Sequence, residues 1–296
     1  MNNALPIYFA LLAAVLYALS APLAKILLQT AAPTVLAGLL YLGAGAGMGL
    51  LNLGLSAVQK QTRRAGLSRR DLPYTLGMVG LDIAAPVLLL VGLVQTPAEN
   101  VALINNFEIV ATAIIALFVF KERISARLWG AIGLITTASI MLCWRGEAAF
   151  AFSKGSLYVL GACVCWGLEN NCTRMLSNKN LLEVVTVKGL GAGAGALCIG
   201  IFMGETLPTG GYLAAALGLG FVAYGLSIFF YMLAQRHLGA AKTSVYYAVA
   251  PFVGVGVSLL IFKETPPLLF WAALLIMACG AYLSVTDTQY DEVNKK

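Results

Sequence analysis

The feature that most constrains this chain is a succession of long apolar stretches separated by short polar or charged segments. Ten stretches of roughly 20 residues each are bounded by charges, prolines or polar clusters: 5–24, 33–55, 73–94, 98–118, 127–144, 155–175, 181–203, 210–234, 240–261 and 266–285. A helix needs about 20 apolar residues to cross the hydrocarbon core of a bilayer. The stretches are continuous rather than alternating, which favours helices over the strands of a membrane barrel. The sequence therefore predicts an all-α integral membrane protein with ten transmembrane helices.

The composition excludes a soluble protein. Of the 296 residues, 60% are hydrophobic and only 11% are charged, against about 25% charged residues in an average soluble domain. So few charges cannot cover the surface of a soluble enzyme or a nucleic-acid-binding protein. We expect the lipid bilayer as the environment, no nucleic acid as a partner, and a first helix that is retained rather than cleaved as a signal peptide.

The basic residues are distributed unevenly between the two sides of the predicted membrane protein. Fourteen of the 19 Lys and Arg residues lie on the side of the N-terminus and four on the other side, with Lys188 inside 181–203. Short cytoplasmic loops carry an excess of Lys and Arg. The distribution predicts a multi-pass protein of the cell (inner) membrane with both termini in the cytoplasm. The net charge of +6 therefore indicates topology rather than an acidic partner.

The two halves of the chain resemble each other. Residues 42–47 and 190–195 both read LGAGAG, and Phe-Lys-Glu occurs at 120–122 and again at 262–264. Each half holds five predicted spans, an odd number, so the halves must have opposite orientation. The sequence predicts two inverted five-helix repeats, 1–150 and 151–296, the second with a short cytoplasmic tail. Inverted repeats are typical of alternating-access transporters.

The glycine strings at 42–47 and 190–195 lie in the middle of predicted helices. A phosphate-binding loop needs a preceding strand and a helix N-terminus, so close packing between helices is the favoured interpretation. The sequence has no Walker-type nucleotide-binding motif, and we expect no cofactor. The cysteines lie in apolar stretches away from the single histidine, His237, so no metal site is predicted.

Several short motifs together resemble the drug/metabolite transporter superfamily, EamA branch. They are the two five-helix halves, Trp166-Gly167 in the opening helix of the second half, the helix-ending Lys-Glu pairs, and Pro251 within 240–261. The first half departs from the family pattern, since Tyr17-Ala18 replaces Trp-Gly and Ile109 stands in place of the proline. The resemblance implies a secondary transporter with a central cavity lined by both halves. It also implies an exporter of amino acids or related metabolites, similar to the YddG-type exporters.

Ionisable side chains inside the predicted spans are candidates for the substrate site, because charge at the bilayer centre is costly. Asp82 and Glu108 lie near the middle of consecutive spans, and Asn105, Glu108 and Thr112 form one polar stripe. Such a carboxylate could bind a substrate ammonium or carry a coupling proton; alternatively, it is protonated and bonded to a neighbouring helix. Glu169 could form an ion pair with Lys188 or take part in the site.

Aromatic side chains are also placed deep in the predicted spans. Tyr224, Ser227 and Tyr231 have the spacing of one helix face. A cavity with tyrosines and few charges suits an aromatic or amphipathic solute and not a sugar phosphate, which needs Arg or Lys clusters. The predicted substrate-binding residues are Tyr17, Ser20, Asp82, Asn105, Glu108, Trp166, Glu169, Asn170, Tyr224, Tyr231, Tyr246 and Tyr247.

The sequence thus favours a transporter of a small molecule and not an enzyme. Three alternatives stay open at this point. They are an efflux protein for drugs or organic cations, an intramembrane enzyme using Ser20, Ser227 or Asp82, and a passive channel.

Overall fold

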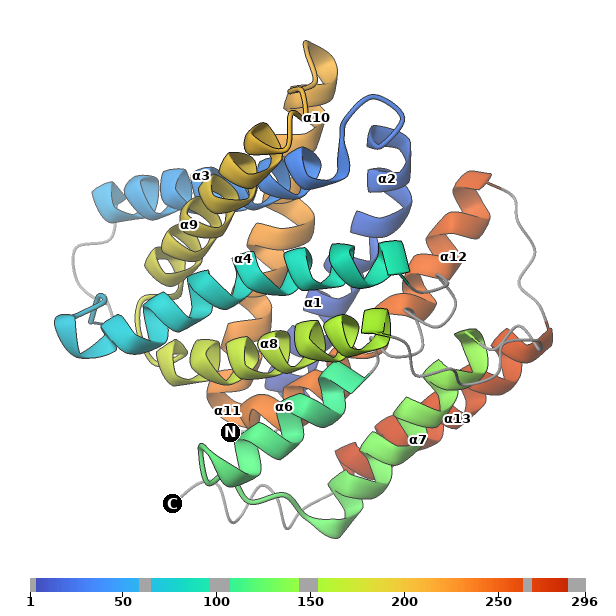
Figure 1. Ribbon diagram of the computed structural model, residues 1–296. Helices are drawn as coiled ribbons and strands as arrows, with labels where there is room; N and C mark the ends of the chain where they lie inside the picture. Colours follow the sequence, from blue (N-terminus) through green and yellow to red (C-terminus); the bar gives the residue numbers. More distant parts are fainter. Residues whose placement is uncertain (1–3, 59–64, 96–106, 144–153, 263–267, 287–296) are drawn as a thin grey trace. The chain divides into compact units, whose positions relative to one another are not determined.

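The computed structural model describes residues 4–58, 65–95, 107–143, 154–262 and 268–286, and every regular element in these ranges is a helix (Figure 1). Within these ranges, five helical segments are long and apolar enough to cross a membrane: Ala4–Ala24, Pro33–Leu55, Arg69–Leu89, Leu181–Phe202 and Gly211–Tyr247. Two apolar helices are shorter, Phe107–Phe118 and Trp271–Ser284. The predicted all-α class is confirmed for the described residues, while the count of ten spans stays a prediction.

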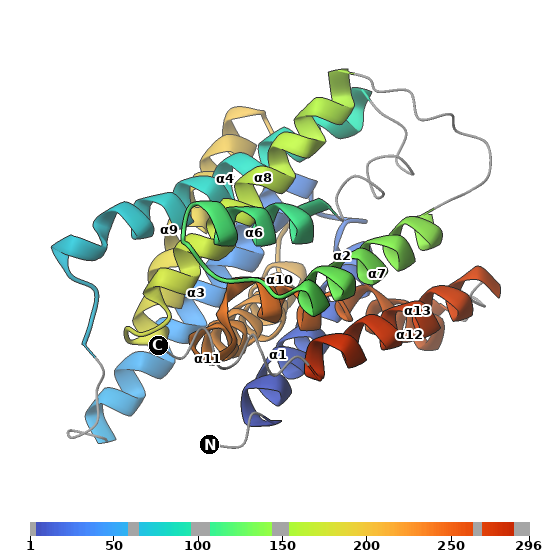
Figure 2. The ribbon, with the colours of Figure 1, turned by 90° about the horizontal axis from the view of Figure 1, so that it is seen from below.

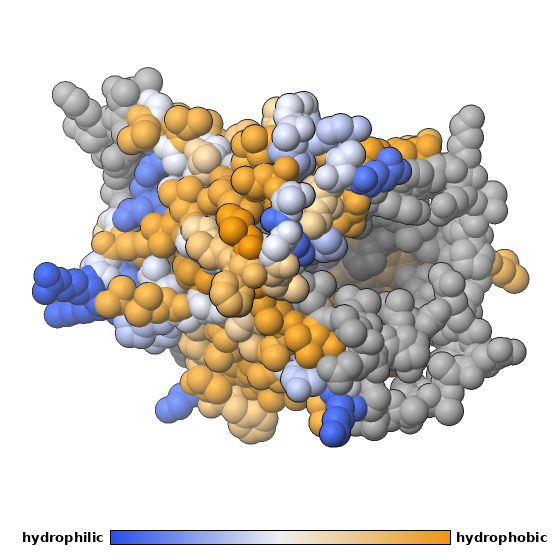
Figure 3. All heavy atoms as spheres, turned by 45° about the horizontal axis from the view of Figure 1, so that its top comes forward, coloured by the Kyte–Doolittle hydropathy of each residue, from blue (hydrophilic) through white to orange (hydrophobic). Residues whose placement is uncertain are grey.

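Large hydrophobic side chains are exposed on the surface of this protein. Phe202 is 94% exposed, and Leu50 and Leu275 are also largely exposed. The face shown in Figure 3 is covered mainly by hydrophobic residues, with hydrophilic ones in separate patches. Exposed apolar area on this scale is unfavourable in water and matches a surface that contacts lipid chains.

The chain divides into two compact units, each built from several segments. Unit 1 comprises 1–80, 173–237 and 250–264, and unit 2 comprises 81–172, 238–249 and 265–296. Each unit therefore takes segments from both predicted repeats. The repeats at 1–150 and 151–296 remain a prediction about sequence symmetry.

Unit 1 is organised around α3 (Pro33–Val58), which packs against α9 (Leu181–Phe202); the two helices lie side by side in Figures 1 and 2. The contact is made by the two LGAGAG strings. A Cβ atom on Gly45 would lie 2.4 Å from the backbone nitrogen of Leu190, and one on Gly189 would lie 2.4 Å from that of Gly45. Only glycine permits so close an approach. The predicted packing role of the glycine strings is confirmed.

A different face of α3 packs against α10 (Gly211–Leu219) and the π-helix η2 (Gly220–Leu226). A Cβ atom on Gly43 would lie 2.1 Å from the carbonyl oxygen of Leu217, and one on Gly220 would lie 2.1 Å from that of Leu40. The remaining helices of unit 1 are α1 (Ala4–Ala18), α2 (Ser20–Leu27), α12 (Ala250–Phe262) and the first part of α11 (Ser227–Tyr247).

Unit 2 contains most of α4 (Leu72–Gln95) and α8 (Lys154–Leu176), together with α6 (Phe107–Phe118), α7 (Ala126–Cys143) and α13 (Leu268–Val285). Helices α7 and α13 pack along each other, as both ribbon views show (Figures 1 and 2). A guanidinium nitrogen of Arg127 donates a hydrogen bond to the carbonyl oxygen of Thr286 at 2.8 Å, which ties one end of this pair.

Three of the predicted spans are interrupted or joined in ways that the apolar pattern did not indicate. Span 5–24 is split into α1 and α2 at Leu19, and span 210–234 runs through α10, η2 and part of α11. The predicted break between 210–234 and 240–261 is instead a kink inside α11 at Gly239, with φ 78° and ψ 173°. Glycine adopts this left-handed φ without a steric penalty, so the helix can change direction there.

The helix that follows this kink is fixed by the first of the two Phe-Lys-Glu motifs. A carboxylate oxygen of Glu122 accepts a hydrogen bond from the backbone N–H of Ala240 at 3.2 Å, the N–H group that the kink leaves outside the helical ladder. Predicted span 240–261 then breaks after Tyr247 and resumes as α12, with Pro251 in its first turn. Proline is tolerated in a first turn because its missing N–H has no helical partner there.

Candidate functional site

The most concentrated polar group among the candidate residues lies in unit 2, where α6 meets α8. Helix α6 contributes Glu108 and Thr112, and helix α8 contributes Asn170 and Asn171; we call these four residues the polar cluster. The side-chain amide of Asn170 donates to the Glu108 carboxylate at 3.0 Å and to the Thr112 hydroxyl at 3.3 Å. One amide therefore holds both groups of the predicted stripe, which confirms that Glu108 and Thr112 share a face of α6.

Asn171 fastens the same two helices to each other. Its amide donates to the backbone carbonyl oxygens of Thr112 at 3.0 Å and of Gly167 at 2.8 Å, and the side chain is 1% exposed. A Cβ atom on Gly167 would lie 2.9 Å from the backbone nitrogen of Thr112. The backbones of α6 and α8 therefore approach closely at this point, which explains why a glycine follows Trp166 in the motif.

The cluster places a partly buried carboxylate among apolar helices with neutral hydrogen-bond donors beside it. An amide donor orients the Glu108 carboxylate without cancelling its charge, in contrast to a Lys or Arg partner. Such a carboxylate can bind an ammonium group or exchange a proton. The structure moves Glu108 from the middle of the predicted span to the first turn of α6. Asn105, the third member of the predicted stripe, lies outside the described residues.

The other predicted polar residues fall into both units. Asp82 and Glu169 are buried in unit 2, and Lys188 and Ser20 are buried in unit 1. The ion pair of Glu169 with Lys188 would join residues assigned to different units and stays a prediction. In the part of the chain that the structure describes, no three His, Cys, Asp or Glu side chains are grouped to hold a metal ion.

A tyrosine cluster lies in unit 1. The ring of Tyr224, in the π-helix η2, contacts Tyr17 of α1 with centroids 5.6 Å apart and Tyr41 of α3 with centroids 5.3 Å apart, both edge to face. This is a favourable geometry for aromatic pairs. The structure brings together two predicted residues, Tyr17 and Tyr224, and adds Tyr41. No helical spacing in the sequence links Tyr41 to the others, since the three rings come from three separate helices.

The π-helix also changes the expected register along the span that carries Tyr224. A π-helix closes i→i+5 hydrogen bonds, so the α-helical spacing used to place Tyr224, Ser227 and Tyr231 on one face does not apply across η2. The Ser227 hydroxyl donates to the carbonyl oxygen of Ala13 at 2.8 Å and is buried, as is Tyr231. Ser227 therefore joins its helix to α1.

The other predicted aromatic residues lie in unit 2. Trp166 in α8 is partly buried, and near the end of α11 Tyr246 is buried while Tyr247 is partly exposed. They stay predicted site residues.

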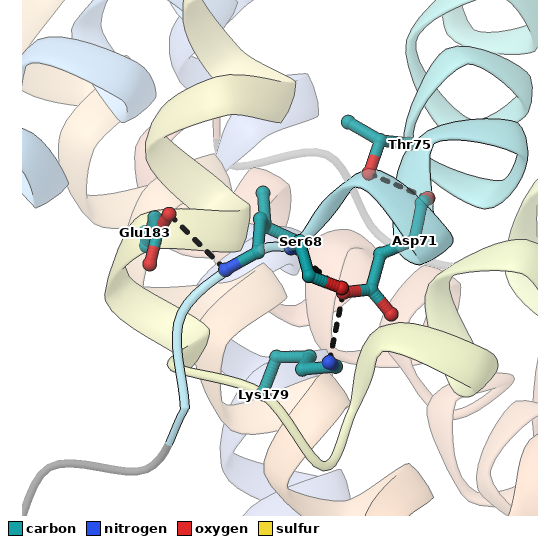
Figure 4. Close-up of polar contacts among 6 residues, drawn as sticks. Ser68, Asp71, Thr75, Lys179 and Glu183 are labelled. Atoms are coloured by element: carbon teal, nitrogen blue, oxygen red, sulfur yellow. Dashed lines mark hydrogen bonds and ion pairs between the residues drawn. The ribbon is translucent and has the colours of Figure 1, made fainter.

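The sequence analysis counted Lys179 and Arg236 only as topology signals, but the structure gives both of them specific partners. Lys179 forms an ion pair with Asp71 at 2.8 Å, and Arg236 donates to the carbonyl oxygen of Lys179 at 3.1 Å (Figure 4 shows the ion pair). Both contacts lie within unit 1. The signal in the sequence that could have found them is the run Ser68-Arg69-Arg70-Asp71, a capping-box pattern at the start of α4.

Comparison with known proteins now places the chain in a family. The sequence profile of the EamA-like transporter family matches residues 4–144 and 153–286, one match in each half. The chain belongs to the EamA-like transporter family. It is therefore a multi-pass membrane transporter, and its partners are a small-molecule substrate and the membrane. The resemblance drawn from the short sequence motifs is confirmed at the level of this family and of the drug/metabolite transporter superfamily.

Two individual relatives agree with this assignment. The chain is 25% identical over 286 residues to an uncharacterized transporter of Methanothermobacter thermautotrophicus, covering 92% of this chain and 83% of the relative. A crystal structure titled only as that of a protein matches with a TM-score of 0.79, covering 98% of this chain and 99% of the other. At 16% identity this second likeness shows that the fold is shared and says nothing of the substrate.

Proposed function

We propose that this EamA-like transporter is a secondary active exporter of amino acids, preferring aromatic or hydrophobic ones, as YddG-type exporters do. The observation that carries the proposal is the hydrogen bond between Glu108 and Asn170 in the polar cluster. It presents a carboxylate and neutral amide and hydroxyl groups inside otherwise apolar helices. We propose further that transport proceeds across the cell (inner) membrane by alternating access, with both termini in the cytoplasm.

The chemistry of the polar cluster suits a substrate with an ammonium group. A carboxylate binds ammonium through charge-assisted hydrogen bonds, which are about twice as strong as neutral ones. The Asn170 amide and Thr112 hydroxyl can donate to a substrate carboxylate or accept from its ammonium. A sugar phosphate would instead require several Arg or Lys side chains. An amino acid matches this set of donors and acceptors.

The tyrosine cluster, considered within its own unit, supports a preference for aromatic or hydrophobic side chains. Its three rings offer apolar faces for stacking and hydroxyls for hydrogen bonds. Aromatic faces also attract organic cations, which is the observation that favours efflux of organic cations as the second candidate function.

Glu108 is also the residue that we propose for coupling to protons. A carboxylate inside a membrane protein can hold either a proton or a substrate ammonium, and exchange between the two links their movements. The two family matches, one in each half of the chain, agree with the predicted inverted repeats, and inverted repeats support alternating access around a fixed site.

The proposal is tested by solute counterflow in proteoliposomes. Wild-type protein preloaded with phenylalanine should accumulate labelled phenylalanine, and Glu108→Gln should lower the initial rate at least tenfold without lowering thermal stability. Asn170→Ala should also slow transport, while the matched variant Asn178→Ala, at an exposed asparagine in the turn after α8, should transport like wild type.

The outcomes separate the candidate functions. Counterflow of organic cations but not of amino acids would replace the proposal with the second candidate, and ohmic currents without counterflow would indicate a channel. A Glu108→Gln variant with wild-type counterflow would remove Glu108 from the site.

A further inference from the structure

A group of polar contacts in unit 1 joins two segments that are far apart in the sequence, the segment before α4 and the turn between α8 and α9 (Figure 4). Asp71 is the centre of this group. Its carboxylate accepts hydrogen bonds from the backbone N–H of Ser68 at 2.8 Å and from the Ser68 hydroxyl at 2.6 Å, and it pairs with Lys179 at 2.8 Å. We call Ser68, Asp71, Lys179 and Glu183 the clamp.

Several backbone contacts reinforce the clamp. The N–H of Leu67 donates to the Glu183 carboxylate at 3.2 Å, and the N–H of Asn180 donates to the carbonyl oxygen of Ala65 at 3.1 Å. Arg236, from α11, donates to the carbonyl oxygens of Ser177 and Lys179. The two segments are therefore joined by side-chain and backbone bonds together.

These contacts distinguish the clamp from an ordinary surface ion pair. An exposed Lys–Asp pair contributes little, because both side chains must be ordered to form it. Here the Asp71 carboxylate is already held by Ser68 and the backbone of Lys179 by Arg236, so less ordering is required. The Asp71 and Lys179 side chains are also only 14% and 25% exposed.

The clamp lies at the ends of the two helices that run on into unit 2. Helix α4 starts one residue after Asp71, and helix α8 ends three residues before Lys179. Inside unit 2, a Cβ atom on Gly92 of α4 would lie 2.6 Å from the Val159 side chain and 2.9 Å from the carbonyl oxygen of Gly155 in α8. The α4–α8 pair is thus held at the clamp and again near its other end.

We propose that Asp71 and Lys179 are positioning residues for transport. By fixing the register of α4 and α8, the clamp keeps Asn170 of α8 in place to hold Glu108. This inference rests on the proposed function of the polar cluster and extends it to two residues that touch no substrate.

The test replaces Lys179 with a residue whose charge can be switched. Lys179→Met removes the ion pair at every pH and should lower the counterflow rate roughly threefold to fivefold, the range that an ion pair of this kind supports. In Lys179→His, the imidazole is charged only below its ordinary pKa of about 6.5. Relative to wild type at the same pH, Lys179→His should transport almost normally at about pH 5.5 and resemble Lys179→Met at about pH 8.

The matched control is Arg70→Gln, which removes a positive charge from the exposed turn beside Asp71. It should leave transport unchanged at both pH values. The other charged groups around the pair are Glu183, Arg236, Arg174 and Arg69. All five neighbouring charged groups, Arg70 among them, are the same in Lys179→His and in wild type, so the ratio of the two rates removes any pH effect of these groups or of proton coupling.

The pH profile separates positioning from folding. All rates are measured well below the melting temperature of each variant, so that a purely structural role would give a ratio independent of pH. A flat ratio for Lys179→His, or a Lys179→Met variant as fast as wild type, would overturn the inference. If wild-type protein shows no counterflow of any amino acid, the proposed function fails first, and the ratio cannot be formed.

Discussion

The crossing of α3 and α9 gives a prediction whose size can be worked from the structure. Gly45 lies where the two backbones are closest, and a Cβ atom there would be 2.4 Å from the Leu190 nitrogen and 2.8 Å from the Gly189 carbonyl carbon. Both neighbours are backbone atoms, so rotating a side chain cannot relieve the clash. Gly45→Ala therefore requires the two helices to separate by about 1 Å to restore ordinary contact distances near 3.5 Å.

We expect this separation to destabilise the protein by about 1–3 kcal/mol, the usual cost of overpacking a well-packed contact. The assay is thermal or denaturant unfolding of the purified protein in detergent, with Gly45→Ala compared to wild type. The matched control is Gly54→Ala on the same helix, where a Cβ atom would have no heavy atom within 4 Å. Because alanine favours helix over glycine by roughly 0.5–1 kcal/mol, Gly54→Ala should be neutral or stabilising.

The double variant Gly45→Ala with Gly189→Ala makes the test stricter. Both residues lie in the same contact, so once the helices have separated for one alanine the second should cost less than it does alone. The reasoning is refuted if Gly45→Ala is as stable as Gly54→Ala, or if the effects of Gly45→Ala and Gly189→Ala simply add.

Three further predictions concern individual contacts. Asn171→Leu should destabilise the folded protein by about 1–3 kcal/mol, because it removes the amide that bonds two buried carbonyl oxygens; unfolding in detergent measures this, and an unchanged midpoint would contradict it. Glu122→Ala should cost roughly 0.5–2 kcal/mol by leaving the Ala240 N–H without its cap, which hydrogen exchange at the start of that helix segment should detect as faster exchange. Tyr224→Ala should raise the apparent KM of counterflow more for phenylalanine than for alanine, whereas Tyr212→Ala, at an exposed tyrosine of α10, should change neither.

The sequence alone was sufficient for the helical class and for some of the contacts between helices. Repeated LGAGAG strings in apolar stretches predict close packing, and the structure shows them packed against each other at Gly45 and Gly189. The spacing of Glu108 and Thr112 predicts a shared face, and Asn170 bonds both. In each case a regular helix carries the information, because residue spacing along a helix determines which side chains lie together.

Other features depend on contacts that a single sequence does not encode locally. Tyr41 joins Tyr17 and Tyr224 only because three separate helices meet, and the π-helix around Tyr224 interrupts the regular spacing from which faces are predicted. Apolar content marked a loop between 210–234 and 240–261, but the left-handed φ of Gly239 makes it a kink within one helix. Lys179 was assigned to topology, since charge counts do not identify ion-pair partners.

The most direct test of the central claim, that the Glu108 carboxylate binds a substrate ammonium, is a binding titration with a pair of matched ligands. Phenylalanine carries the ammonium, whereas N-acetylphenylalanine has the same ring and carboxylate with the charge removed. Isothermal titration of the purified wild-type protein should show binding of phenylalanine and at least tenfold weaker binding of the acetylated compound. Glu108→Gln should abolish that difference. Equal affinity of the wild-type protein for both ligands, or an undiminished preference in Glu108→Gln, would contradict the account.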